Sequence, residues 1–249
     1  MCSSDLTMEK EGRGFADVLK DAQDLGYAEA DPSFDIDGVD AAHKLSILAS
    51  LAFGTRLDFA SVDITGIRHV IAADIAEAAA LGYRVRLVGM AESSQEGLFQ
   101  RVHPMLVPMS HPLAHVDGSL NAVVAEGNFV GRLFFQGAGA GDGPTASAVV
   151  ADLIDVARDE YGDAFAMPID YLASQPKADA GNRVGRVYMR FKVQDRPGVL
   201  AEIAAATRDA GVSIESMIQR GAAVDGAVLM AIVTHAGEQH RVEIGRAHV

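Results

Sequence analysis

A group of charged side chains surrounds one predicted turn and the start of the apolar helix that follows it. The stretch Glu29–Lys44, EADPSFDIDGVDAAHK, holds five acidic residues, one histidine and one lysine. Asp40 and Lys44 are four residues apart, so on a helix they share one face and can form an ion pair. A lysine held by an aspartate beside a substrate pocket can exchange a proton with a carbonyl or alkoxide oxygen. The spacing therefore predicts an acid–base pair.

The same spacing also has a plainer explanation. Acids at a helix start favour the helix dipole, and an exposed lysine–aspartate pair is a common surface feature. Against this, Lys44 interrupts an otherwise apolar helix, where a buried charge needs a reason. His43 is the next residue along and points about 100° away around the helix, so we expect it to pack or face solvent. The remaining histidines show no converging ligand set, so we predict no metal site.

Hydrophobic periodicity and turn residues predict helices first, then a mostly antiparallel sheet, then a closing helix. The first helix is expected over 15–25. The second, 38–54, has Asp37 as a plausible N-cap and Gly54 as its stop. Further elements are a helix over 67–81, strands over 83–91, 98–108, 119–127 and 129–137, and a helix over 144–160. The predicted class is α+β, with helices packed on the sheet.

A second pattern begins after a stretch rich in proline and glycine. Residues 161–185 have little periodicity and are predicted to be a linker. Beyond it the order is strand 186–194, turn, helix 199–211, strand 212–220 and strand 227–235. This βαββ order is most of a ferredoxin-like βαββαβ unit, with the last helix and strand missing.

A glycine-rich turn, Gly137–Gly143, reads GAGAGDG and precedes the predicted closing helix. Taken alone it is weak evidence for nucleotide binding, because it has neither the GxGxxG spacing of a dinucleotide fold nor the lysine of a P-loop. On the residues alone, a flexible strand-to-helix connection is the favoured explanation. Small residues there would nevertheless let backbone amides approach a ligand at a helix N-terminus.

Composition excludes several classes of protein. The net charge of −13 disfavours nucleic acid and anionic membrane surfaces as partners. Apolar runs are too short to span a bilayer, and the polar, acidic start does not resemble a signal peptide. One cysteine excludes a disulfide framework. We expect a soluble, cytoplasmic protein. The matched ends MCSSDL and IGRAHV correspond to nearly reverse-complementary codons of a sequencing adapter. We therefore expect residues 1–6 and 244–249 to be translated adapter, and both ends to be cut.

Three segments in order resemble the substrate domain of homoserine dehydrogenases. They are GYAEADP…DIDGVDAAHKLSILA, VHPMLVPMSHPLAHVDGSLNAV and FFQGAGAGDGPTASAVVADL, and the likeness covers nearly all of Met8–Arg158. The resemblance implies a substrate domain over 7–160 and the NAD(P)H-linked interconversion of aspartate semialdehyde and homoserine, in threonine, methionine and isoleucine biosynthesis. It implies that Lys44 is the acid–base residue and that Asp40 orients it. Glu29 would bind the substrate ammonium group and Asp35 would be a further acid of the pocket.

The same resemblance implies a cofactor, NADP or NAD, with Gly139 and Gly141 near its nicotinamide end. The family's dinucleotide domain precedes the substrate domain, and no GxGxxG turn stands near the N-terminus here. We therefore expect this chain to bind the cofactor poorly by itself, and the residues that choose between NAD and NADP are not in it.

The segment VQDRPGVLAEIAAATRDAGVSIESMIQ, Val193–Gln219, resembles an ACT domain, which we place over 186–243. The resemblance implies an amino-acid effector, threonine for this pathway, bound near Asp195, Gly198, Leu200 and Ile214 at a homo-oligomer interface. A plain dimerisation domain without ligand is the alternative.

Two further functions remain open on the residues alone. The chain could be a non-catalytic amino-acid sensor, with the ACT-like part functional and the rest a scaffold. It could also be an unrelated enzyme, such as a lyase, that uses the Asp40–Lys44 pair.

Overall fold

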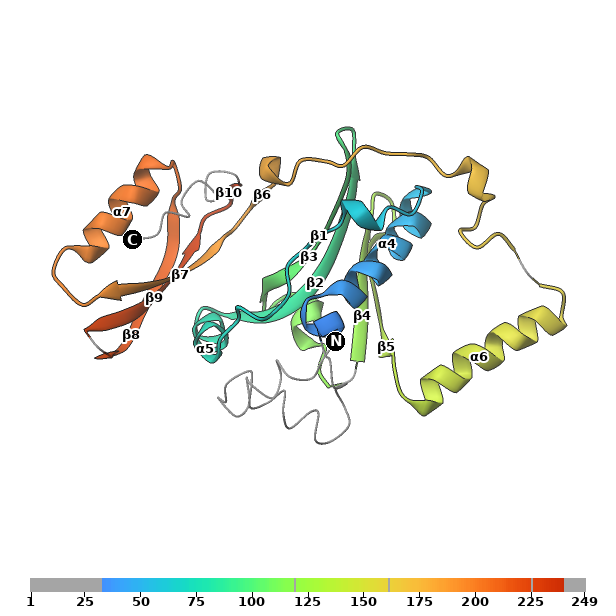
Figure 1. Ribbon diagram of the computed structural model, residues 1–249, viewed down its shortest axis with the longest axis horizontal. Helices are drawn as coiled ribbons and strands as arrows, with labels where there is room; N and C mark the ends of the chain where they lie inside the picture. Colours follow the sequence, from blue (N-terminus) through green and yellow to red (C-terminus); the bar gives the residue numbers. More distant parts are fainter. Residues whose placement is uncertain (1–32, 119, 161, 225, 240–249) are drawn as a thin grey trace. The chain divides into compact units, whose positions relative to one another are not determined.

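The computed structural model describes residues 33–118, 120–160, 162–224 and 226–239 (Figure 1). The chain divides into two compact units, Met1–Lys177 and Ala178–Val249. The predicted helix over 15–25 and the predicted substrate residue Glu29 lie outside the described residues. The described part mixes helices with short, mainly antiparallel sheets, so the α+β prediction is confirmed.

Helix α4, Val39–Phe53, carries both members of the predicted acid–base pair. The short helix α3, Ser33–Ile36, precedes it. Gly54 ends α4 as predicted: it has φ 61°, and its N–H donates to the Ser50 carbonyl at 3.0 Å. The prediction that Asp37 caps the start is wrong. Gly38 occupies the N-cap position with φ 80°, and the Asp37 carboxylate instead accepts hydrogen bonds from Arg68.

A three-stranded sheet supports α4. Strands β2, Tyr83–Ser94, and β3, Gly97–Pro108, form a long antiparallel hairpin, and β1, Asp63–Ile64, runs parallel to β3. The strands predicted over 83–91 and 98–108 are therefore confirmed. Helix α4 packs on β2 and β3. The buried cluster between them is apolar and consists of Ala42, Leu45, Val62 and Val102.

Helix α5, Ala72–Ala80, also packs on β2 and is shorter than the predicted helix over 67–81. Its first residues are replaced by a turn, in which the Val70 N–H donates to the Ile67 carbonyl at 3.0 Å. The Asp74 side chain accepts from the Ile71 N–H at 2.9 Å. This carboxylate caps the helix and explains why it begins there.

The strands predicted over 119–127 and 129–137 are confirmed as β4, Leu120–Gly127, and β5, Gly131–Ala138, which pair antiparallel. Helix α6, Asp142–Ala157, follows the glycine-rich turn. The helix predicted over 144–160 is therefore confirmed, although no residue of α6 is buried. The side chains of Val149, Leu153 and Val156 are more than half exposed.

The second unit has the predicted βαββ order. Strand β7, Tyr188–Gln194, helix α7, Val199–Asp209, strand β8, Ile214–Val224, and strand β9, Ala227–Thr234, follow one another along the chain. The sheet order is β7-β9-β8, with β9 antiparallel to both neighbours. The ferredoxin-like fold has this split arrangement. As the middle strand, β9 supplies most of the buried residues of this unit.

The segment over 161–185, predicted as a linker, contains the 3-10 turns Ile169–Tyr171 and Ala180–Asn182 and the short strand β6, Val184–Gly185. Strand β6 pairs antiparallel with β10, Gly237–Glu238. Two more 3-10 turns, Phe59–Ser61 and Pro112–His115, lie in the first unit. Within the described residues, no helix is both long and apolar enough to span a membrane.

Candidate functional site

Asp40 and Lys44 meet on one face of α4, as their spacing predicts. The Lys44 Nζ lies 2.6 Å from the Asp40 Oδ2, and the side chains are 66% and 36% exposed, respectively. The argument that Lys44 is a buried charge in an apolar helix is therefore wrong for this structure. An exposed pair adds at most about 1 kcal/mol to stability, so folding does not require it.

The face of α4 around the pair is itself apolar. Ile47, Leu48 and Leu51 lie on the same side of the helix as Lys44, and each is more than two-fifths exposed. The opposite side, with Leu45 and Ala49, is buried against the sheet. Helix α4 thus has two apolar faces, and the charged pair stands in the one that the described residues leave open.

A contact between distant residues holds the turn before α4. The Arg68 Nη2 donates to the Asp37 Oδ2 at 3.0 Å and to the Ser33 Oγ at 3.1 Å. Behind this turn, a Cβ on Gly66 would stand 2.2 Å from the carbonyl oxygen of the fully buried Ile36, so only glycine fits. We did not predict either contact, because partners some thirty residues apart leave no periodic signal in a single sequence.

The other acidic residues of the predicted pocket are placed only in part. Asp35 lies in α3, five residues before Asp40, and its side chain is exposed. Glu29 falls outside the described residues. Asp35 and Glu29 as substrate residues therefore remain predictions.

We predicted that His43 packs or faces solvent, and it does both: the residue is exposed, and its ring contacts two neighbours. Its ring lies between two aromatic rings, with centroid distances of 5.4 Å to Phe34 and 4.2 Å to Phe59, both edge-on. These contacts connect α4 to α3 on one side and to the 3-10 turn Phe59–Ser61 on the other, so His43 helps to hold the helix in place. Among the described residues, no group of three or more His, Cys, Asp or Glu side chains could hold a metal ion.

The two predicted cofactor residues of the glycine-rich turn have different surroundings. A Cβ on Gly139 would lie 2.4 Å from the Asn121 Nδ2, so packing within the chain already accounts for this glycine. Gly141 is the N-cap of α6 with φ 109°, and a Cβ there would meet only the Pro144 Cδ, at 3.8 Å. The space beside Gly141 and the unpaired N–H groups of a helix start suit an approaching polar ligand. Of the two, Gly141 fits the predicted role better.

The pKa of His111, in the first unit, departs clearly from its ordinary value. Burial, and after it the positive charge of Arg132, lowers the pKa of His111 below 6.5, while Glu126 opposes this. The His111 Nδ1 also accepts from the Leu113 N–H at 3.3 Å, which caps a 3-10 turn.

The four predicted effector residues fall into two groups. Asp195, Gly198 and Leu200 lie where β7 ends and α7 begins, and the Asp195 N–H donates to the Gly226 carbonyl at 2.9 Å. Ile214 begins β8 opposite Thr234, whereas Gln194, at the end of β7, lies opposite Ala227. The two groups therefore lie seven residue steps apart along β9, from Ala227 to Thr234, which is roughly 23 Å at about 3.3 Å per step. One subunit does not bring them together.

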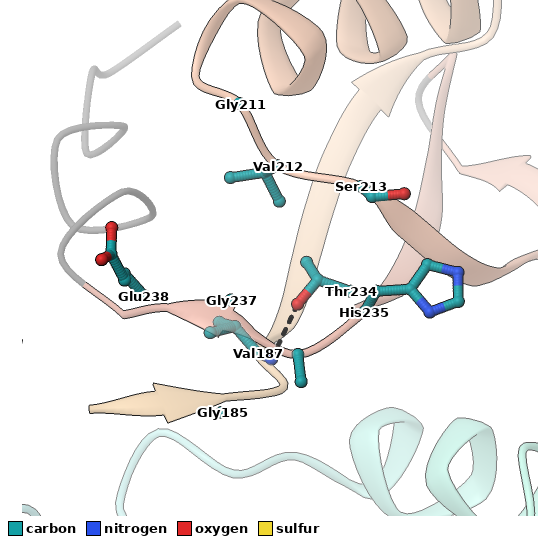
Figure 2. Close-up of a pocket in the computed structure, with 10 residues that line it drawn as sticks. Gly185, Val187, Gly211, Val212, Ser213, Thr234, His235, Gly237 and Glu238 are labelled. Atoms are coloured by element: carbon teal, nitrogen blue, oxygen red, sulfur yellow. Dashed lines mark hydrogen bonds between the residues drawn. The ribbon is translucent and has the colours of Figure 1, made fainter. Parts of the chain in front are cut away.

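A small pocket lies at the Ile214 end of this sheet (Figure 2). Val187, Val212 and Thr234 line it, and the Thr234 Oγ1 accepts a hydrogen bond from the Val187 N–H at 3.0 Å. The His235 ring points outward, away from Val212 (Figure 2). At the opposite end, Arg196 holds Glu202 through two hydrogen bonds of 2.9 and 2.8 Å, which raise the pKa of Arg196 further.

Comparison with known proteins matches both units to families. Residues 6–154 match the homoserine dehydrogenase model, and residues 187–244 match the ACT domain model. The chain belongs to the homoserine dehydrogenase family. Lys44, Asp40 and the glycine-rich turn all lie within the residues that match the homoserine dehydrogenase model.

Individual homoserine dehydrogenases are similar over nearly the whole chain. The enzyme of Pseudomonas aeruginosa is 45% identical, over 94% of this chain and 56% of its own length. The crystal structure of a homoserine dehydrogenase from Thiobacillus denitrificans has a TM-score of 0.87 and 42% identity, over 97% of this chain and 56% of that one. A hyperthermophilic archaeal homoserine dehydrogenase mutant in complex with NADPH is 32% identical, with a TM-score of 0.52, over 64% of this chain and 44% of its own. This chain spans little more than half the length of the first two.

Proposed function

We propose that this chain supplies the proton-transfer half of a homoserine dehydrogenase, which interconverts L-aspartate 4-semialdehyde and L-homoserine with NAD(P)H. The observation that carries the proposal is the 2.6 Å pair of Lys44 and Asp40 on the open face of α4, within the residues that match the family. Neither a non-catalytic sensor nor an unrelated lyase accounts for the family match over residues 6–154.

In the reducing direction, the Lys44 ammonium group donates a proton to the aldehyde oxygen, which becomes the hydroxyl of homoserine. A reduced nicotinamide cofactor, when bound, supplies the hydride to the aldehyde carbon. Asp40 holds the Lys44 Nζ in position through the 2.6 Å contact. The neutral amine then recovers a proton from water. In the oxidising direction, Lys44 accepts the hydroxyl proton.

The acidic residues beside the pair suit the substrate. The substrate carries an ammonium group, and carboxylates are its natural partners. Asp35, and Glu29 outside the described residues, are our candidates for this contact. The open side of Gly141 would admit one end of the cofactor, for which NADPH is the precedent in the archaeal relative.

The second unit is proposed to bind an amino-acid effector, with L-threonine as the first choice. Because Leu200 and Ile214 lie at opposite ends of the sheet, a site that uses both requires a homo-oligomer. In two copies related by symmetry, one end of each sheet can meet the other end of its partner. We place the enzyme in the cytoplasm.

The test is Lys44→Ala in a chimaera that joins this chain to the unaligned part of the Pseudomonas aeruginosa relative. We expect turnover of homoserine with NADP or NAD to fall by about 10²–10⁴, as for loss of a general acid–base group. The matched control is Lys192→Ala, which removes an exposed lysine from β7 and should leave turnover unchanged. Full activity in Lys44→Ala with the fold intact would reject the proposal.

A further inference from the structure

A segment between the two family matches lies against the end of the helix that carries the pair. We call Met167–Lys177 the strap; it falls after residue 154 and before residue 187, and belongs to the first unit. The Ala173 N–H donates to the Gly54 carbonyl at 2.9 Å, and the Arg56 N–H donates to the Ala173 carbonyl at 2.9 Å. Ala173 also forms a parallel bridge with Thr55. One residue of the strap is thus bonded both to the stop of α4, Gly54, and to Arg56 two residues beyond it.

The strap has a second attachment on the β2–β3 hairpin. The Leu98 N–H donates to the Pro176 carbonyl at 2.9 Å, and the Lys177 Nζ lies 2.5 Å from the Asp63 Oδ1 at the start of β1. The chain passes so close that a Cβ on Gly97 would stand 2.1 Å from the Pro176 oxygen. This distance excludes any side chain at 97 while the strap is in place.

Buried side chains reinforce these backbone contacts. Leu172 is 5% exposed and Thr55 1% exposed. The Arg56 Nε donates to the Leu172 carbonyl at 3.4 Å, and the Met167 Cε lies 3.1 Å from the position of a Gly54 Cβ. The strap is therefore packed as well as hydrogen-bonded, which a passive connection on the surface does not require.

We propose that the strap positions the Asp40–Lys44 pair, by clamping the C-terminal end of α4 to the β2–β3 hairpin. The importance of this position rests on the proposed function, but the contacts of the strap with α4 and the hairpin do not depend on that function. The pair itself is set by helical spacing. What helical spacing cannot set is where the whole helix sits on the sheet, and the strap ties the helix stop to two strands of that sheet. Ala173, Pro176 and Lys177 are positioning residues and do not touch substrate.

The clamp also stands directly before the second unit along the chain. Lys177, which bonds Asp63, is the last residue of the first unit, and Ala178 is the first residue of the second. Along the chain, no residue lies between the strap and the second unit. A route from that unit to α4 along the backbone therefore passes through the strap.

The test is NMR of the whole chain with Gly97→Ala, which the strap cannot accommodate. Two readouts follow the seat of α4: amide exchange at Arg56 and Leu98, and the Overhauser effect between the Leu45 methyls and Gly89. A Cβ on Gly89 would lie 3.4 Å from Leu45, so these groups are adjacent in the seated helix. We expect about tenfold faster exchange, in line with the loss of one or two hydrogen bonds, and a weaker Overhauser effect. Gly131→Ala is the control, because Gly131 has φ 72° with nothing near its Cβ.

A merely structural role would speed exchange everywhere, including at Ile75 in α5, and such a uniform change would overturn the proposal. So would an unchanged Leu45–Gly89 contact once the Leu98 amide is released. If Gly97→Ala does not fold or does not release the strap, Ala173→Pro decides, because it deletes the N–H that bonds Gly54. Leu172, at φ −64° and ψ 125°, tolerates a following proline.

The conservative variant Ala173→Ser keeps the N–H at an exposed position and should restore wild-type exchange. Unchanged exchange at Arg56 in Ala173→Pro would reject the clamp. None of these measurements uses turnover, so they fail independently of the proposed function.

Discussion

The Asp40–Lys44 pair and the predicted effector residues were inferred in the same way, yet the structure treats them differently. The pair is local: four residues along one helix bring the two charges to 2.6 Å. The effector residues span two elements, and the register of β9 puts Leu200 and Ile214 at opposite ends of the sheet. Spacing within one helix thus predicts that two side chains are close in space, whereas membership of one sequence motif does not.

The pair nevertheless depends on distant residues for its place in the molecule. Helix α4 is seated by Leu45 on β2 and β3, by Arg68 at its start and by the strap at its stop. The two regions therefore differ in what a mutation can reveal. In the first unit, seat and chemistry can be changed separately, because they lie on opposite faces of one helix.

The largest effect is expected from Leu45→Ala, which attacks the seat. Leu45 is 8% exposed in the cluster under α4, so its truncation should lower the free energy of unfolding of the first unit by about 2–4 kcal/mol. Denaturant unfolding followed by circular dichroism measures it. On the other face, Lys44→Ala should change stability by less than about 0.5 kcal/mol. Equal losses of unfolding free energy in the two variants would show that the buried and the exposed faces of α4 contribute alike to stability.

Asp40→Asn is expected to have the next largest effect, on turnover. Asparagine keeps the shape of the side chain but removes the charge that holds the Lys44 ammonium group. In the chimaera we expect kcat to fall by about ten- to a hundredfold, less than for Lys44→Ala, because the proton donor itself remains. Steady-state kinetics with homoserine measures it. A kcat equal to that of the parent chimaera would mean that the two residues form only an ordinary surface pair.

The sequence was most informative where signals are periodic or local. It predicted α4 with its stop at Gly54, the four strands β2 to β5 of the first unit, and the βαββ order of the second unit. It failed at Asp37, which matches an N-cap in type but is engaged by Arg68. It predicted the helix α6 but not its exposure: the apolar stripe is typical of a core helix, yet no residue of α6 is buried. The partner of Asp37 is thirty-one residues away along the chain, and α6 has no buried residue against a neighbour in the described part of the chain. Neither fact can be inferred from the residues nearby in the sequence.

A smaller effect is expected for the effector residues, and it tests whether a single subunit suffices. If the proposed site combines the two ends of the sheet from different subunits, Leu200→Ala and Ile214→Ala should each weaken L-threonine binding by about tenfold, near 1.4 kcal/mol. Calorimetry on the whole chain, together with sedimentation, measures affinity and assembly. If Ile214→Ala alone weakens binding, the site is instead the pocket beside Val212 and Thr234. No binding by the parent chain would leave the ACT unit as a dimerisation domain.

The smallest effect concerns His111, where local and distant causes act on one ring. Its pKa lies below 6.5 because of burial and then Arg132, so the unfolded chain holds this proton more tightly than the folded one. The folded state is therefore favoured above pH 6.5, and this contribution is lost as the pH falls through the lowered pKa. An NMR titration of the His111 ring should show that pKa, and Arg132→Gln, at a residue contributed by β5, should move it part of the way back. Arg190→Gln, on β7 in the other unit, should not. An unmoved pKa in Arg132→Gln would mean that Arg132 does not contribute and that burial of the ring lowers the pKa of His111.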